Sequence, residues 1–510
     1  MKIRMYEGYI RNRQKLCEEL SLSPVNNRKN TEEEILLSGY RRWGSDVVNH
    51  LYGAFAFAIL DEEKNEYFCA RDPFGIESFY YLQTGNDFLC STDLKTILES
   101  GKYRKELDRD ALQLYMTFGY PVGEITLYKG IRKLSAGHTL TVNDCGCLSQ
   151  TYFTPSFAPD YSVSEEEWIK EIDNTLQEIL DEDKQNFDFS NARSFLSGGV
   201  DSSYLLAASG VKNACGIGFG ENEFSESAPA HKTAETLGAA FREITVTAEE
   251  YFASIPNFIK ASELPTSDAS SPAFSIGCKR VAEETGLCLS GEGADEFYAG
   301  YYVYHRAEEL YRQKNYTYLS CDGIMEQEKA LELLKQDEKY PLKRLMNDDA
   351  DKEQDTDYLS RMLKTDISLW LEGDILFGVN RAVKTNGLNV LLPFSDRRMF
   401  ELSSRIPSGL KLKDGCGKYI FRKAAETRLP EEIAFRKKIG FSVPARKWFS
   451  EDRFRPEIEK VLFSGVSSSF FDADILRRYW DSFLAGDVPC FRIVYAAYIF
   501  IIWYETVFQQ

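Results

Sequence analysis

The most informative segment of the chain reads Ser197-Gly198-Gly199-Val200-Asp201-Ser202-Ser203. An apolar strand over residues 192–196 precedes it, and a helix that begins near Ser202 is expected to follow. Glycines let the backbone turn tightly and approach phosphate oxygens, and the first amides of a helix attract anions. The three serines add hydroxyl donors, and Asp201 offers a carboxylate to a magnesium ion beside the phosphates. The segment predicts a phosphate-binding loop; it is not a Walker A loop, because no Lys-Ser or Lys-Thr follows the glycines.

Strands and helices alternate on both sides of this loop. Ser164 and Glu167 form a capping box, so an amphipathic helix is expected to open this part of the chain. The next expected elements are strands at residues 214–219 and 242–246 and a helix near residues 228–237. Such alternation is typical of a parallel α/β sheet. Residues 160–510 are predicted to form one α/β domain, mainly helical beyond Tyr301, with an acidic, solvated loop or helix face at residues 347–357.

The first part of the chain has a different pattern, with short strands and polar turns. Residues 53–60 and 67–71 predict a hairpin around an Asp-Glu-Glu-Lys-Asn turn, and residues 137–142 alternate as a further strand. Residues 155–161 are rich in Pro, Ser and Asp, as is typical of a linker. We therefore expect an α+β, sheet-rich domain over residues 1–154.

Composition excludes several classes of protein. The 510 residues carry 61 basic and 79 acidic side chains, a formal charge of −18, which disfavours nucleic acid and anionic lipid as partners. The first residues are polar, so no signal peptide is expected, and the longest apolar run, residues 493–503, is shorter than the roughly 20 residues that span a bilayer. It is expected to be a buried helix. The 11 cysteines and four histidines lack zinc-site spacing, so reduced thiols in the cytoplasm are expected.

Further motifs give the chain a family resemblance. A second signature, Ser290-Gly291-Glu292-Gly293-Ala294-Asp295-Glu296, again follows an apolar strand. Residues 392–396 (Leu-Pro-Phe-Ser-Asp), 417–425 and 436–444 supply three more ordered blocks. Together with the first loop they resemble the asparagine synthetase family of N-type ATP pyrophosphatases. Residues 51–58 and 70–76, with 127–130 and 134–138, resemble the class II glutaminase domain that precedes the synthetase in this family.

The resemblance implies a fold and a set of site residues. It implies a truncated, Ntn-hydrolase-like antiparallel β sandwich followed by a parallel-sheet domain similar to adenine-nucleotide α-hydrolases. ATP and Mg²⁺ are the implied cofactors, with Asp201 and Asp295 as metal ligands. The implied nucleotide-binding residues are Leu196, Ser197, Gly198, Gly199, Asp201, Ser202, Ser203, Ile217, Ser290, Gly291 and Lys418. Lys438 would neutralise charge during adenylation, and Glu292 would accept the proton of the attacking amine.

The same residues are also compatible with structural roles that involve neither catalysis nor ligand binding. Asp201 and Asp295 are also suited to turns or helix caps, and Glu292 to an idle position on a Gly-rich turn. Lys437 and Lys438 are also compatible with a solvated basic patch.

The sequence departs from the family pattern at two places. A class II glutaminase needs an N-terminal cysteine, whereas Lys2 follows Met1 here, and Glu7 stands where an oxyanion asparagine is expected. Glu32 stands where a glutamine-binding aspartate is expected, so we expect no glutaminase activity. In the acceptor region, Leu391 replaces an arginine that could clamp an α-carboxylate. This change leaves the acid substrate open.

Two classes of function follow. The first is an amide-forming ligase that joins a small-molecule or peptide carboxylate to ammonia or another amine. Its specialised variant resembles β-lactam synthetases and lasso-peptide macrolactam cyclases. The second is a non-catalytic scaffold that binds nucleotide, which the retained motifs disfavour. No membrane or nucleic-acid partner is expected, whereas a second copy or a partner protein could cover the strand edges of the truncated first domain.

Overall fold

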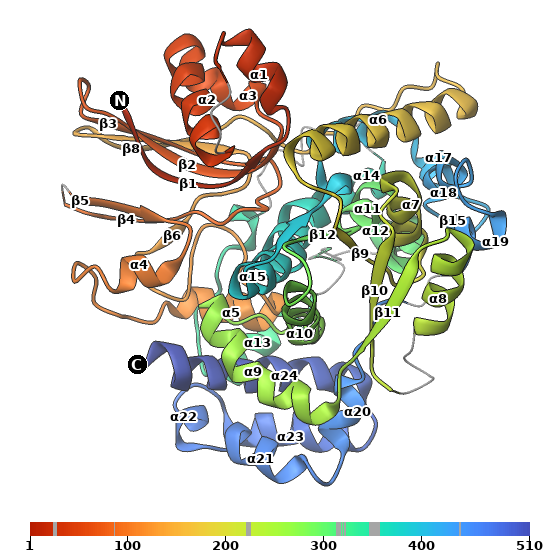
Figure 1. The fold of residues 1–510 in the computed structure, drawn as a ribbon. Coiled ribbons are helices and arrows are strands. Elements are labelled where there is room, and N and C mark those ends of the chain that lie inside the picture. Colours follow the sequence, from red (N-terminus) through yellow and green to blue (C-terminus); the bar gives the residue numbers. More distant parts are fainter. Residues whose placement is uncertain are drawn as a thin grey trace.

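A computed structural model describes residues 1–23, 28–85, 87–220, 226–312, 318, 320, 323–345, 357–437 and 440–509. Figure 1 shows two layers of antiparallel strands at one end of the molecule, a parallel sheet in the middle and the C-terminal helices at the other end. The expected acidic segment at residues 347–357 lies almost entirely outside the described residues.

The first half is an antiparallel sandwich. One sheet has the order β1-β2-β3-β7-β8 and the other the order β5-β4-β6, with every pairing antiparallel. Ala56, Phe79 and Leu140 belong to the apolar layer between the sheets. Helices cover the outer face of the larger sheet (Figure 1). The elements are β1 Lys2–Ile10, α1 Arg13–Glu19, α2 Arg28–Trp43, α3 Val47–His50, β2 Gly53–Asp61, β3 Glu66–Arg71, β4 Tyr80–Thr84, β5 Asp87–Ser91, α4 Leu94–Leu98, α5 Arg109–Phe118, β6 Arg132–Lys133, β7 His138–Asn143 and β8 Gly146–Thr151.

The second half is built on a five-stranded parallel sheet. Helix α6 starts at the predicted capping box of Ser164 and Glu167. The elements that follow are α6 Glu165–Asn186, β9 Arg193–Phe195, α7 Val200–Ser209, β10 Asn213–Gly218, α8 Ser227–Thr236, β11 Ala240–Thr245, α9 Ala248–Ser262, α10 Ser270–Ala282, β12 Leu287–Leu289, α11 Ala294–Tyr298 and, after several helices, β13 Asn389–Leu391. The predicted α/β and α+β architecture is confirmed.

The strand order places the site. The strand order of the sheet is β11-β10-β9-β12-β13. The strands that follow β9 in the chain, β10 and β11, therefore lie on one side of it, whereas β12 and β13 lie on the other side. Strands β9 and β12 are neighbours, with Ser194 opposite Leu289. In open parallel sheets, ligands bind beyond the carboxyl ends of the two strands where the order reverses. The loops that begin at Leu196 and at Ser290 both leave the sheet at this point.

Helices complete the molecule after residue 301. They are η3 Tyr302–Arg306, α12 Ala307–Arg312, α13 Gln327–Leu334, η4 Leu342–Arg344, α14 Tyr358–Asp366, the π-helical η6 Ile367–Ile375, α15 Leu376–Asn386, η7 Pro393–Ser395, α16 Arg397–Arg405, α17 Ser408–Lys411, α18 Tyr419–Ala425, α19 Glu431–Ala434, α20 Ala445–Ser450, α21 Arg455–Leu462, α22 Gly465–Ser468, α23 Ala473–Leu484, α24 Val488–Trp503 and η8 Tyr504–Phe508, with a small hairpin of β14 Leu412–Lys413 and β15 Cys416–Gly417.

The apolar run at residues 493–503 is a buried helix, as predicted. It belongs to α24, whose side chains from Ile493 to Trp503 are all buried. With η8 the helical segment Val488–Phe508 has 21 residues and a mean hydropathy of 1.4, so by length and composition alone it could cross a membrane. In this fold it packs inside the largest apolar core.

Candidate active site

The phosphate-binding loop has the predicted strand–turn–helix context. The hydroxyl of Ser202 accepts the backbone N–H of Ser197 at 3.1 Å, and the N–H of Gly199 lies 3.3 Å from the hydroxyl oxygen of Ser197. These bonds close the loop on itself. Gly199 caps α7, so the first amides of that helix point out of its N-terminus, where they can bind an anion.

The two glycines of the loop have different roles. Gly198 has φ +81°, and a Cβ there would lie 2.8 Å from the backbone nitrogen of Ala230. Its carbonyl accepts a hydrogen bond from Arg436 at 2.8 Å, and neither residue lines the cavity. Gly198 is therefore needed for the turn and for close packing on α8, and its direct contact with the nucleotide stays a prediction. Gly199 lines the cavity.

The second loop packs closely against the first. A Cβ on Gly291 would lie 3.3 Å from the Cβ of Asp201 and 3.4 Å from the backbone nitrogen of Ser202. Gly293 has φ +97° and lies against Ser395, whose hydroxyl donates to the carbonyl of Glu292 at 2.8 Å. These contacts fix the positions of Glu292 and Asp295 relative to the phosphate-binding loop.

Lys418 joins Asp201 and Asp295. Its ammonium nitrogen lies 2.6 Å from Asp201 Oδ1 and 2.8 Å from Asp295 Oδ1, and its side chain is only 2% exposed. Gly300 makes this approach possible, because a Cβ there would overlap both Asp295 and Lys418. No pattern in the sequence predicts this function of Gly300.

The two carboxylates fit a magnesium ion. They converge on one cationic group, and Mg²⁺ is usually bound by one or two carboxylates together with substrate phosphates. No group of three or more potential ligands occurs among the described His, Cys, Asp and Glu residues, so the phosphates would have to complete the coordination shell. Lys418 supplies a second positive charge at the same place.

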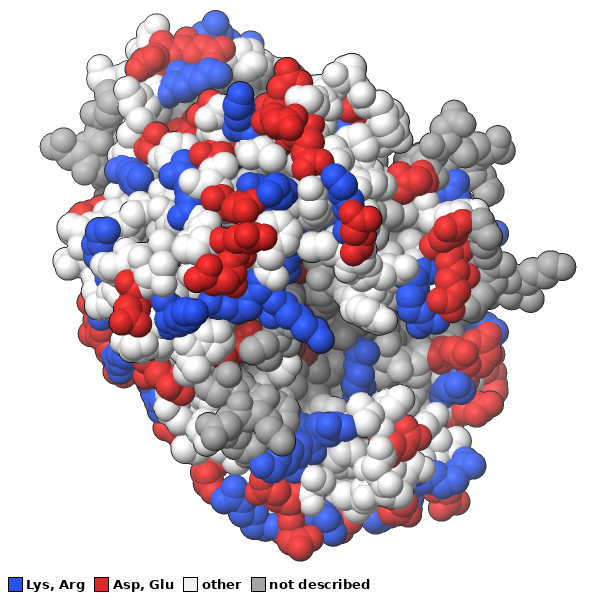
Figure 2. Space-filling model, turned by 90° about the vertical axis from the view of Figure 1, so that its right-hand side faces the viewer, with Lys and Arg blue, Asp and Glu red and all other residues white. Residues whose placement is uncertain are grey.

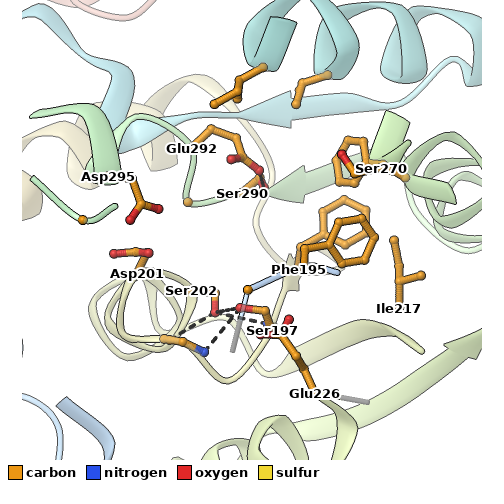
Figure 3. Close-up of a pocket in the computed structure, with 18 of the residues that line it drawn as sticks. Phe195, Ser197, Asp201, Ser202, Ile217, Glu226, Ser270, Ser290, Glu292 and Asp295 are labelled. Carbon is orange, nitrogen blue, oxygen red and sulfur yellow. Dashed lines mark hydrogen bonds between the residues drawn. The ribbon is translucent and has the colours of Figure 1, made fainter. Parts of the chain in front are cut away.

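A cavity of about 520 Å³ lies above these loops. Figure 3 shows Asp201 and Asp295 facing each other at one end, with Phe195, Ile217 and Ser270 at the other. The rings of Phe195 and Phe274 lie 4.9 Å apart and form an apolar wall suited to a purine base. Phe274 and Ser270 were not predicted, because α10 reaches the cavity only through its packing on the sheet.

Glu292 lies between the two ends of the cavity (Figure 3). Its carboxylate accepts a hydrogen bond from Ser290 at 3.1 Å. Behind this loop, Glu296 is buried and accepts a hydrogen bond from Tyr301 at 2.5 Å. Burial, reinforced by neighbouring Asp295, raises the pKa of Glu296 to about 8.

Most of the predicted site residues are brought together. Those that line the cavity are Leu196, Ser197, Gly199, Asp201, Ser202, Ile217, Ser290, Gly291, Glu292, Asp295 and Lys418. Ser203 does not line it: the side chain is fully buried, and its hydroxyl has no partner among the described residues. Leu391 is also absent from the lining and packs in an apolar core. Lys438 lies outside the described residues, so its role stays a prediction.

The surface is less acidic locally than the overall charge suggests. Figure 2 shows acidic and basic side chains mixed over the face on the α8 and α19 side of Figure 1. That face is hollowed near its centre, with Lys and Arg side chains at the rim. Such local positive charge favours the approach of an anion such as a nucleotide.

Two family models match the chain. The one described as Asparagine synthase matches residues 184–503, more than half of the sequence, and the one described as Glutamine amidotransferase domain matches residues 2–153. The chain belongs to the asparagine synthase family. This confirms the predicted family and, at the level of the family, an ATP-dependent carbon–nitrogen ligase. The boundaries expected at residues 154 and 160 stay a prediction.

Individual members of the asparagine synthase family are similar over most of the chain. The glutamine-hydrolyzing asparagine synthetase 1 of Bacillus subtilis is 27% identical over an alignment of 541 residues, which covers 98% of this chain and 85% of that protein. A putative glutamine-hydrolyzing asparagine synthetase of Mycobacterium bovis is also 27% identical, over 92% of this chain and 79% of that protein. Amidase chry2 of Gibberella zeae is 27% identical over 55% of this chain and 44% of its own length.

Proposed function

We propose that this protein activates a carboxylate with ATP as an acyl-adenylate and transfers the acyl group to an amine, releasing pyrophosphate and AMP. One observation carries the proposal: a helix N-terminus, two carboxylates and a buried lysine converge at one end of a cavity that also holds Glu292. Anion-binding amides beside a carboxylate pair are what a nucleotide triphosphate with its metal requires.

The cavity suggests how ATP is bound. The adenine would lie against Phe195 and Ile217, and the phosphates over the amides at the start of α7. Mg²⁺, held by Asp201 and Asp295, would neutralise phosphate charge, and Lys418 would hold the β- and γ-phosphates. This orientation would direct the α-phosphate towards Ser290 and Glu292, which lie between the two ends of the cavity (Figure 3).

The reaction consists of two successive nucleophilic displacements. An oxygen of the substrate carboxylate attacks the α-phosphorus, and the bond from that phosphorus to the oxygen bridging to the β-phosphate breaks. The positive charge at Lys418, together with that of Lys438, which the family resemblance assigns to this step, would stabilise the departing pyrophosphate. The amine nitrogen then attacks the acyl carbon, AMP departs, and Glu292 accepts the surplus proton of the nitrogen.

We further propose that the chain has no glutaminase activity of its own. Glu32 is fully buried and accepts hydrogen bonds from the Tyr6 hydroxyl at 2.8 Å and from the N–H of Ile10 at 3.1 Å. These partners occupy a carboxylate that would otherwise bind glutamine, and Glu7 replaces the expected oxyanion asparagine. The amine would come from solution, from a partner or from a second substrate. Absence of ammonia release from glutamine by the purified protein would agree with this proposal, and stoichiometric release would contradict it.

The cellular compartment and the partners of the enzyme are also proposals. Every cysteine among the described residues is a free thiol, which suits a reducing cytoplasm. Strand β8 forms one edge of its sheet and is largely exposed, and Leu148 is 58% exposed. A second copy or a partner protein would cover this edge.

The decisive test is ATP–pyrophosphate exchange over a panel of carboxylic acids. The wild-type protein should catalyse exchange with at least one acid, and Asp201→Asn should lower the rate at least 100-fold. Lys438→Ala should lower turnover by a similar factor with little change in ATP affinity. An exposed control, Asp188→Asn, should leave the rate unchanged. Absence of exchange with every acid, together with ATP binding that survives in Asp201→Asn, would favour a scaffold instead.

A further inference from the structure

Two arginines, Arg422 and Arg436, connect the segments around the phosphate end of the cavity. Arg436 follows α19, is half-buried and does not line the cavity. Its Nη1 donates to the carbonyl of Gly198 at 2.8 Å, in the turn that precedes α7. This guanidinium therefore contacts the phosphate-binding loop without being part of the cavity wall.

The same nitrogen of Arg436 also contacts helix α8. It lies 3.1 Å from the carbonyl oxygen of Pro229 and 3.1 Å from the hydroxyl oxygen of Thr233. The planar guanidinium, with its several N–H groups, is suited to binding such a set of oxygens. Three acceptors from two segments thus fix the guanidinium, which in turn holds the Gly198 turn against α8.

Arg422 extends the connection to the Lys418 side of the cavity. Its Nε donates at 3.0 Å to the carbonyl of Gly417, the residue before Lys418. Its Nη1 donates to the carbonyls of Ala434 at 2.7 Å and of Arg436 at 3.0 Å. The backbone of Arg436 is therefore held by one arginine while its own side chain holds the phosphate-binding loop.

The peptide between Gly198 and Gly199 links Arg436 to a serine of the cavity. The carbonyl oxygen of this peptide is bound by Arg436, and its N–H donates to the hydroxyl oxygen of Ser197 at 3.3 Å. Successive hydrogen bonds polarise one another, so a positive charge at the oxygen strengthens the N–H as a donor. The Ser197 hydroxyl accepts this bond and keeps its own proton for another partner.

The neighbouring hydroxyl of Ser202 leaves that proton for the cavity. Ser202 Oγ accepts the N–H of Ser197 at 3.1 Å and donates to the carbonyl of Gly199 at 3.3 Å. The two hydroxyl oxygens lie 3.2 Å apart, and both serines line the cavity (Figure 3). Because the proton of Ser202 is directed to Gly199, the proton of Ser197 can be donated to an oxygen of a bound phosphate.

We propose that Arg436 is a positioning residue for the phosphates of ATP, which holds the Gly198–Gly199 peptide and, through it, the Ser197 hydroxyl in place without touching the nucleotide. Its loss should weaken the binding of phosphates and spare the base, because Phe195 and Ile217 lie at the other end of the cavity (Figure 3). This inference rests on the proposed function, because it assumes that phosphates bind at the start of α7.

The affinities for ATP and for adenosine, measured by calorimetry, test the inference. Arg436→Met keeps a long unbranched side chain but removes the charge and the donors, so the Kd of ATP with Mg²⁺ should rise at least tenfold. The Kd of adenosine, which has no phosphates, should change less than twofold. Ser197→Ala should also weaken ATP binding, and the double variant should lose clearly less than the product of the two single effects, because both act on the same hydroxyl.

Two further variants control this experiment. Arg436→Lys, which keeps the charge, should recover part of the affinity and serves if the methionine variant does not fold. Arg455→Met is the matched control, since Arg455 is also half-buried and donates to a backbone carbonyl, that of Ser450, at 2.8 Å, but is absent from the cavity lining. Both Kd values should be unchanged in that control.

The possible results separate this inference from the proposed function. An unchanged Kd of ATP in Arg436→Met would overturn the inference while the ligase function stands. So would an equal rise for ATP and adenosine, or a double variant whose loss equals the product of the single losses. A wild-type protein that does not bind ATP would overturn the proposed function itself.

Discussion

Gly300 matters because of the space that it leaves. Lys418 is fully buried between Asp201 and Asp295 only because residue 300 has no side chain. Gly300→Ala should displace the ammonium or Asp295 and lower kcat/KM for ATP in the exchange assay at least tenfold, equivalent to about 1.4 kcal/mol of transition-state stabilisation.

Another glycine provides the control for this substitution. Gly409 has no atom near an added Cβ, so Gly409→Ala should retain full activity. Full activity of Gly300→Ala would show that Lys418 and Asp295 need not meet.

Lys411 should make the stability of the protein depend on pH. Burial lowers its pKa to about 7, with Asp357 opposing the shift only in part. The nitrogen has no hydrogen-bond partner among the described residues and lies 4.6 Å from the ring centre of Phe157. Because the folded protein binds this proton less tightly than the unfolded chain, the lysine destabilises the fold most below pH 7. The penalty fades as the pH rises towards 10.5.

Replacement of this lysine tests the sign of the effect. Lys411→Met should raise the Tm by roughly 3–5 °C at pH 6 and by much less at pH 9.5, as measured by thermal denaturation at both pH values. Lys212→Met, at an exposed position, should change neither value. An equal gain at both pH values would mean that packing of the methionine, and not removal of a proton, stabilises the variant.

At the scale of elements, η6 connects the two halves of the chain to the cavity. Its Trp370 and Asp374 line the cavity, while its Glu372 contacts the N-terminal sandwich. Glu372 lies 2.6 Å from Arg71 and 2.8 Å from Lys133, and all three side chains are buried. The position of the η6 side of the cavity therefore depends on an ion-pair cluster with the other half of the chain.

Breaking this cluster should destabilise the protein strongly. Glu372→Gln leaves two buried cations without their counter-charge, so the free energy of unfolding should fall by roughly 3 kcal/mol. Urea denaturation measures this change. Glu62→Gln, which removes an exposed pair with Lys2, should leave the midpoint unchanged. A similar result for both variants would mean that the buried cluster contributes little.

For the whole molecule, the largest apolar core belongs to both halves. It contains Tyr80, Tyr115 and Tyr128 from the first half and the residues of α24 from the second. The Tyr115 hydroxyl donates to the carbonyl of Ala496 at 3.0 Å, and the rings of Tyr128 and Trp503 lie 5.7 Å apart. The two predicted domains thus share a core.

A shared core predicts cooperative unfolding. Urea titrations followed by tryptophan fluorescence and by far-ultraviolet circular dichroism should coincide in a single transition. A fragment of residues 160–510 should be poorly soluble, because it would expose the apolar face of α24 that the first half covers. Two separate transitions, or a stable and soluble fragment, would show that the halves fold independently.

The sequence by itself determined the local features: the strand–loop–helix at Ser197, the capping box at Ser164, the parallel α/β alternation and the buried C-terminal helix. These depend on backbone preferences and hydrophobic period within one segment, which neighbouring residues fix. It also predicted that Asp201 and Asp295 follow the ends of two strands, but it did not predict that Lys418 lies between them.

Only the tertiary structure decided which distant residues share the cavity. Lys418 contacts both carboxylates because Gly300 leaves room for its side chain. Trp370 and Asp374 lie on η6, which an ion pair with the first half of the chain holds in place. It also separated the roles of Gly198 and Gly199, and placed Ser203 away from the lining. Such positions result from the packing of elements far apart in the chain, so no spacing within one segment could predict them.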